Sequence, residues 1–147
     1  MDKLLDSLQS VIKNERIGNP VFLRVVMNVS ENNQGLIFPI SQLFYFSNTL
    51  ILSLVQSVFA QGSDESNQVT AMVHYEDGQM ALLSTNRVDT QTDLDLMLVG
   101  TKGVIYHQTP IGRNYLSGTP PQVRENVIIA QDLKQSLITG KPILVEE

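Results

Sequence analysis

Few residues of this chain have the type and the spacing that catalysis requires. Histidine titrates near neutral pH and often serves as a general base, and the chain has two, His74 and His107. His74 alternates with apolar neighbours, as in a β-strand, and His107 lies at the end of another strand-like run. Neither has an acid or a nucleophile beside it in the sequence. We therefore expect neither histidine to be catalytic and keep both as candidate binding residues.

Carboxylates and phosphate-binding motifs give no stronger pattern. Asp89, Asp93 and Asp95 lie at the entrance to a predicted strand, where paired carboxylates could exchange protons or hold a hard cation. Their alternation with leucines favours the other interpretation, the solvated face of a strand. The chain has no cysteine, which excludes thiolate metal sites and cysteine nucleophiles. Because no glycine-rich phosphate fingerprint occurs either, we predict no catalytic, metal-binding or cofactor-binding residue.

A row of uncharged polar residues is the strongest local pattern. It lies between Pro39 and Phe59, a stretch that predicts one long helix, and the row recurs near helical spacing. A helix face in contact with solvent usually carries Lys and Glu, and this stretch has no charged residue. The row therefore favours a pocket wall, a subunit contact or a contact with the sheet, and solvent exposure is the alternative. The candidate ligand- or partner-binding residues are Ser41, Tyr45, Asn48, Gln56, His74 and His107.

The elements that must position these residues follow from periodicity and from turn residues. Helices are expected over residues 2–15, 39–59 and 123–139, and strands over 21–29, 69–75, 80–85, 94–98, 104–107 and 143–145. The Asp77-Gly78 pair predicts a tight hairpin turn. We expect the four strands from residue 69 to residue 107 to form an antiparallel meander. The predicted class is α+β, a mostly antiparallel open sheet with about three helices chiefly on one face.

Composition limits the remaining classes. With 147 residues, 42% of them hydrophobic and 17% charged, the chain is expected to fold as one domain, 1–147. A net charge of −5 with scattered basic residues argues against nucleic-acid binding. The apolar stretch 36–60 is interrupted by polar residues at helical spacing, so we expect no membrane span. No secretory signal is recognisable at the N-terminus, which makes the cytoplasm the expected location.

Four motifs together resemble one known family. They are Ile17-Gly18-Asn19-Pro20-Val21, the spaced set Val69, Tyr75, Asp77, Gly78, Ala81 and Leu83, the run from Leu96 to Val104, and the run from Ser136 to Pro142. Each alone is a turn or a helix cap. In this order and at this spacing they resemble the C-terminal domain of the glucose–fructose oxidoreductase / inositol dehydrogenase (Gfo/Idh/MocA) family, over nearly the whole chain.

The resemblance implies a fold, a surface and a site. Members of the family are NAD(P)-dependent sugar or polyol dehydrogenases that join an N-terminal Rossmann domain to a C-terminal α/β domain. It implies that the 69–107 sheet is an oligomer surface and that the 39–59 helix faces the substrate pocket. The family's Rossmann half, with its glycine-rich loop and E-K-P lysine, has no counterpart in this sequence.

The long helix departs from the family as well. Its usual D-x-x-x-H-type pair falls on Ser41 and Tyr45 in the best register, with Asn48 one turn further on. No carboxylate or imidazole remains there, and tyrosine, with an ordinary pKa near 10, is a poor base at neutral pH.

We therefore expect a stand-alone, non-catalytic relative of this domain that acts as a dimeric binding or interaction module, packed through its sheet face. It would hold no cofactor on its own. The alternative is half of an NAD(P)-dependent sugar or polyol dehydrogenase, either completed by a separate Rossmann subunit or derived from a longer enzyme. A purely structural oligomerisation module is the third interpretation.

Overall fold

The computed structural model describes residues 2–30, 35–89, 92–110, 132–133 and 135–144. The helices are α1 (Asp2–Lys13) and α2 (Ile37–Leu50), and residues 132–133 and 135–139 are also helical. The strands are β1 (Pro20–Ser30), β2 (Val55–Gln61), β3 (Gln68–Tyr75), β4 (Met80–Val88), β5 (Asp93–Gly100), β6 (Val104–Pro110) and β7 (Ile143–Leu144). The rest of the predicted 123–139 helix lies outside the described residues.

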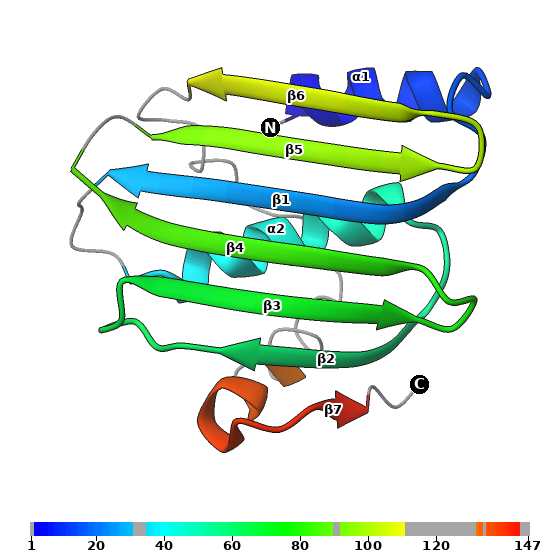
Figure 1. The fold of residues 1–147 in the computed structure, drawn as a ribbon. Coiled ribbons are helices and arrows are strands. Elements are labelled where there is room, and N and C mark those ends of the chain that lie inside the picture. Colours follow the sequence, from blue (N-terminus) through cyan, green and yellow to red (C-terminus); the bar gives the residue numbers. More distant parts are fainter. Residues whose placement is uncertain (1, 31–34, 90–91, 111–131, 134, 145–147) are drawn as a thin grey trace.

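The strands form one open sheet in the order β6-β5-β1-β4-β3-β2-β7 (Figure 1). β1 pairs with β4 in parallel, and every other pair is antiparallel. The predicted four-strand meander is therefore wrong in one respect, because β4 and β5 are not neighbours. The hairpins β3–β4 and β5–β6 form as predicted, and β1 lies between them. Its apolar residues of both parities predict a strand that is covered on much of both faces, but α1 and α2 cover only one of them.

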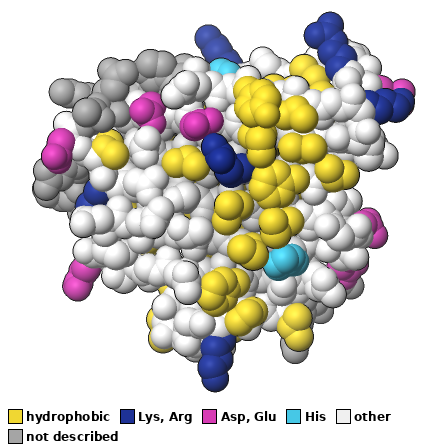
Figure 2. All heavy atoms as spheres, viewed as in Figure 1, with side chains coloured by type: hydrophobic (Ala, Val, Ile, Leu, Met, Phe, Trp, Pro, Cys, Tyr) yellow, Lys and Arg dark blue, Asp and Glu magenta, His cyan; other side chains and the backbone are white. Residues whose placement is uncertain are grey.

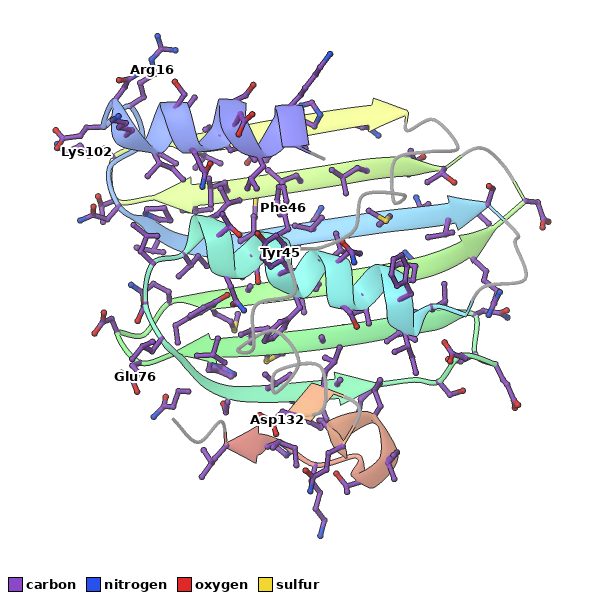
Figure 3. The ribbon with its side chains drawn as sticks, turned by 180° about the vertical axis from the view of Figure 1, so that it is seen from behind. Arg16, Tyr45, Phe46, Glu76, Lys102 and Asp132 are labelled. Carbon is purple, nitrogen blue, oxygen red and sulfur yellow. The ribbon has the colours of Figure 1, made fainter. Side chains whose placement is uncertain are left out.

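Both helices lie on the same face of the sheet (Figures 1 and 3). The side chains that β1 turns toward them, Leu23, Val25, Met27 and Val29, are at most 4% exposed. They pack with the apolar side of α2 and with alternate residues of the other strands in a single core. The α+β class, with its helices chiefly on one face, is confirmed. No helix among the described residues is both long and apolar enough to cross a membrane.

The predicted helix over 39–59 is wrong in its second half. α2 ends at Leu50, Ile51 takes an extended conformation, and the chain continues as β2. The N-terminal end of α2 has no side-chain cap of its own, and Asp64 supplies one from the β2–β3 loop by accepting a 3.0 Å hydrogen bond from the Ile37 N–H. Gln56, placed on the helix by the sequence, therefore belongs to a strand.

Candidate functional site

The outer side of α2 carries neutral polar groups, as the sequence predicts. Ser41, Tyr45, Asn48 and Thr49 are half-buried there, whereas Phe46 and the rest of the sheet-facing side are buried (Figure 3 labels Tyr45 and Phe46). We call these four residues the α2 stripe. It has no carboxylate, imidazole or amine, so Tyr45 is its single ionisable side chain.

Two hydroxyls of the α2 stripe are already bonded within the helix. Ser41 Oγ donates to the Ile37 carbonyl at 2.8 Å, and Thr49 Oγ1 donates to the Tyr45 carbonyl at 3.0 Å. Such bonds to the preceding turn leave only the lone pairs of each hydroxyl for a ligand. The stripe therefore offers acceptors at these two positions rather than donors.

Asn48 is tied to the sheet by a buried tyrosine. The Tyr75 hydroxyl donates to Asn48 Oδ1 at 2.8 Å and lies 3.0 Å from Ser47 Oγ, which itself donates to the Phe44 carbonyl. Tyr75 is 1% exposed, and burial raises its pKa because a phenolate would be poorly solvated there, an effect that the Ser47 hydrogen bond partly offsets. Tyr75 is therefore a neutral donor at physiological pH, and Asn48 has a structural role that the sequence did not reveal.

The six candidate residues do not form one site. Ser41, Tyr45 and Asn48 share the outer side of α2, whereas Gln56 lies exposed at an irregularity in the β2–β3 pairing. His74 is exposed on β3, on the sheet face opposite the helices. His107 pairs with the buried Leu96 and so lies on the helix side of β6, near the opposite edge. Their roles in binding stay predictions.

The sheet face opposite α1 and α2, here called the open face, is covered by no described helix. Its side chains divide into two halves along the strands. One half is mainly apolar, with Phe22, Leu82, Met80, Met72, Phe59, Met97, Val99, Val104 and Tyr106. Figure 2 shows these hydrophobic side chains gathered across the strands. The other half is polar, with Asn28, Asn86, Asp93, Asp95, Gln68, Thr70, Ser84 and Gln108.

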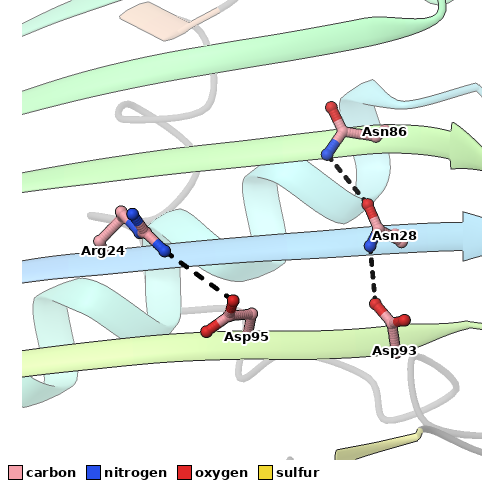
Figure 4. Close-up of polar contacts among 5 residues, drawn as sticks. All are labelled: Arg24, Asn28, Asn86, Asp93 and Asp95. Atoms are coloured by element: carbon pink, nitrogen blue, oxygen red, sulfur yellow. Dashed lines mark hydrogen bonds and ion pairs between the residues drawn. The ribbon is translucent and has the colours of Figure 1, made fainter. Parts of the chain in front are cut away.

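The polar half contains a chain of hydrogen bonds that runs across four strands. Asn28 Nδ2 donates to Asp93 Oδ1 at 2.8 Å, and Asn86 Nδ2 donates to Asn28 Oδ1 at 3.0 Å (Figure 4). Ser84 Oγ donates to Asn86 and accepts from Gln68 Nε2, both at 3.3 Å. A carboxylate can only accept hydrogen bonds, so Asp93 fixes the donor direction of every hydrogen bond in this network. The aspartates at this strand are thus part of a surface network, as the solvated-face interpretation predicts.

A hollow of about 330 Å³ lies between the two halves. Arg24, Val25, Val26, Gln68, Thr70, Leu82 and Ser84 line it. Arg24 makes a loose ion pair with Asp95, with Nη2 3.8 Å from Oδ2, and its Nε is buried without a hydrogen-bond partner (Figure 4). Sequence reasoning missed this hollow, although Arg24 was visible as an exception in an otherwise apolar strand. Among the described residues, no three His, Asp or Glu side chains come together as metal ligands.

Comparison with solved structures identifies the fold. A putative myo-inositol dehydrogenase from Sinorhizobium meliloti superposes with a TM-score of 0.78 and 12% identity over 97% of this chain and 62% of its own. A myo-inositol dehydrogenase from Corynebacterium glutamicum gives 0.78 and 14% over 97% and 61%. The chain shares the fold of these inositol dehydrogenases. A probable dehydrogenase from Thermotoga maritima gives 0.75 and 15% over 96% and 61%.

The inositol-dehydrogenase fold confirms, at the level of architecture, the expected resemblance to the C-terminal domain of Gfo/Idh/MocA oxidoreductases. The chain spans about three fifths of the length of the dehydrogenases that it matches. No family model and no curated protein sequence matches the chain.

Two of the motifs behind the resemblance meet in space. Lys102 N–H donates to the Ile17 carbonyl at 2.7 Å, and Thr101 N–H donates to the Asn19 carbonyl at 3.0 Å. A Cβ on Gly100 would lie 2.1 Å from the Ile17 oxygen, so this approach requires glycine. These motif residues therefore hold the architecture together, and none of them brings a catalytic group to the α2 stripe.

Proposed function

We propose that the chain is a non-catalytic binding module that assembles as a homodimer through its open face and presents the α2 stripe to a small polar ligand or a partner. The chemistry of the α2 stripe is the observation that supports a non-catalytic binding role. Proton transfer at neutral pH requires a group whose pKa lies near 7. The stripe offers hydroxyl and amide groups and one tyrosine, which suit hydrogen bonding to a polar ligand better than proton abstraction.

The open face supports the dimer. Phe22 and Val26 of β1 project onto it and are only half-buried, although the sequence of β1 predicts apolar cover on much of both faces. A contiguous apolar surface of this kind on a folded chain usually marks an association site. A stable interface buries roughly 800 Å² on each partner, and two sheets packed face to face provide such an area through their inward side chains.

The oligomeric state tests the assembly. We expect sedimentation equilibrium or light scattering to give a mass of two chains. Val99→Glu places a charge in the apolar half of the open face and should shift the chain to monomers, because a buried, unpaired carboxylate is costly. Gln9→Glu, on the exposed side of α1, is the matched control and should leave the dimer intact. A monomeric parent protein at micromolar concentration would refute this part of the proposal.

Cofactor titration tests the non-catalytic part. We expect the purified chain to leave the fluorescence of NADH and NADPH unchanged and to oxidise none of a panel of sugars and polyols with NAD⁺ or NADP⁺. Saturable binding of either reduced cofactor, or turnover of any polyol, would contradict it.

A second function is favoured by the coverage of the matched dehydrogenases. About two fifths of each lies outside the match, and one similar structure, a scyllo-inositol dehydrogenase from Lactobacillus casei, was solved with NAD(H) and scyllo-inositol bound. The chain would then be the substrate half of an NAD(P)-dependent sugar or polyol dehydrogenase whose dinucleotide-binding half is supplied separately or by a longer protein. A complex isolated through a tag on this chain that reduces NAD⁺ with a polyol would establish this function.

A further inference from the structure

The hollow on the open face owes its shape to differences in side-chain length. Val26, Ser84 and Thr70 are short and adjacent in the register of β1, β4 and β3. Longer side chains border them, those of Arg24, Leu82 and Gln68. At about 330 Å³ the hollow is at the small end of the range of roughly 300–1,000 Å³ that is typical of ligand pockets, which suits a single ring better than a large molecule.

The lining of the hollow has two kinds of group. Val26 and Leu82 offer apolar contact, whereas Arg24 Nε is a buried donor without a partner. The Thr70 hydroxyl makes no hydrogen bond with the described residues. A guanidinium beside an apolar floor stabilises an aromatic ring through its face. Unpaired donors and hydroxyls stabilise a polar atom at the end of that ring. The chemistry that fits best is therefore an aromatic side chain with a hydroxyl tip, such as tyrosine.

Tyr106 meets this description on the same face. It lies on β6, pairs with Met97, and is 75% exposed, which is unusual for a side chain of its size. Phe22 and Phe59, the other aromatic residues of the described open face, are half-buried and have no hydroxyl. We propose that Tyr106 of one copy inserts into the hollow of a second copy, so that each dimer contains two such contacts.

Strand order makes this exchange self-consistent. Tyr106 is on β6 and the floor of the hollow is on β4 and β3, so β5 and β1 lie between them. A two-fold axis that runs over β5 and β1 brings each Tyr106 over the partner's hollow, and the two contacts are identical, as a two-fold interface requires.

The same axis passes close to Arg24 and Asp95, which are side by side on β1 and β5. Each copy then places its Arg24 near the partner's Asp95. The face is thus complementary to itself in charge as well as in shape, which favours a second copy over an unrelated partner.

This inference rests on the proposed homodimer and is tested by crosslinking. The chain has no cysteine, so introduced thiols are unique. We combine Tyr106→Cys with Thr70→Cys and treat the protein with a short bis-maleimide, because sheets packed about 10 Å apart are too far for a disulfide. Within one copy the two positions are four strands apart, at about 4.8 Å per strand, so the reagent cannot bridge them. We expect a covalent dimer from the double variant and little from either single variant.

Dissociation constants provide a second readout. Tyr106→Ala should weaken the dimer at least tenfold, as for a central aromatic anchor, and Tyr106→Phe should weaken it less because the ring is kept. Gln108→Ala, on the same strand and face, is the control and should change the dissociation constant of the dimer less than threefold. The inference is overturned if the parent protein is a dimer, the double cysteine variant does not crosslink, and Tyr106→Ala does not weaken the dimer. The proposed homodimer would still hold in that case. A monomeric parent would overturn both.

Discussion

Removing one hydroxyl from the core is expected to loosen the contact between α2 and the sheet. Tyr75→Phe keeps the ring of a 1% exposed residue and deletes its oxygen. The lost hydroxyl donates a hydrogen bond to Asn48 Oδ1 at 2.8 Å, and its oxygen lies 3.0 Å from Ser47 Oγ. No other described group is bonded to that Asn48 oxygen, so the variant leaves an acceptor in a half-buried place without its donor.

The size of the effect follows from these two contacts. A hydrogen bond inside a protein contributes roughly 0.5–1.5 kcal/mol, and a buried group left unpaired costs about 1–3 kcal/mol. Ser47 keeps its bond to the Phe44 carbonyl, which limits the loss on that side. We expect the free energy of unfolding to fall by about 2 kcal/mol, which moves the urea midpoint by about 1 M for an m-value of about 2 kcal/mol per molar.

Urea unfolding followed by far-UV circular dichroism measures this shift, since the chain has no tryptophan to report by fluorescence. Tyr45→Phe is the matched control, because its hydroxyl bonds to no described residue, and it should change the midpoint by less than a quarter as much. If Tyr75→Phe and Tyr45→Phe are equally mild, the buried cluster does not stabilise the packing of α2 and the reasoning fails.

The same hydroxyl predicts a dependence on pH. Burial raises the pKa of Tyr75 above its ordinary value of 10.0, so the folded state holds the phenolic proton more tightly than the unfolded state does. The stabilisation is complete below about pH 10 and is lost as the pH rises above it. The advantage of the parent protein over Tyr75→Phe should therefore shrink in alkaline buffer.

Three further changes test other parts of the fold. Asp64→Ala removes the acceptor that caps α2 and should cost about 1 kcal/mol in urea unfolding. Gly100→Ala forces a Cβ against a backbone oxygen, whereas the Cβ of Gly103→Ala meets only ordinary contacts at 3.5 Å or more. Gly100→Ala should therefore lower the melting temperature far more than Gly103→Ala. Equal effects of the two variants would contradict the close approach at Gly100. Ser136→Ala unpairs a buried N–H of β2 and a carbonyl after the last helix, so amide exchange in β2 should accelerate.

The elements that the sequence predicts well are those with periodic apolar residues and explicit turn residues. α1, β1 and the β3–β4 hairpin follow directly from such patterns, and the Asp77-Gly78 turn takes a positive φ at Gly78 as predicted. The uncovered sheet face was also expected. These features depend on residues that are close together in the sequence, which is why sequence patterns could predict them.

The errors arise where distant segments decide the outcome. The stretch after Leu50 has no glycine or proline to end a helix, and the extended Ile51 is followed by β2 because pairing with β3 and β7 satisfies its backbone. Strand order depends on pairing between strands that are far apart in the sequence. The position of β1 between the two hairpins could therefore not be predicted from local patterns. The hollow and the Tyr75–Asn48 contact likewise join residues far apart in the chain.

The central position of β1 has a consequence for biosynthesis. This strand leaves the ribosome before both of its neighbours, because β4 and β5 begin only at Met80 and Asp93. At roughly 5–20 residues per second, translation leaves both edges of an apolar strand without partners for several seconds. A nascent chain halted before Gly100 should remain bound to chaperones or be degraded, and native structure should form only once β5 has emerged.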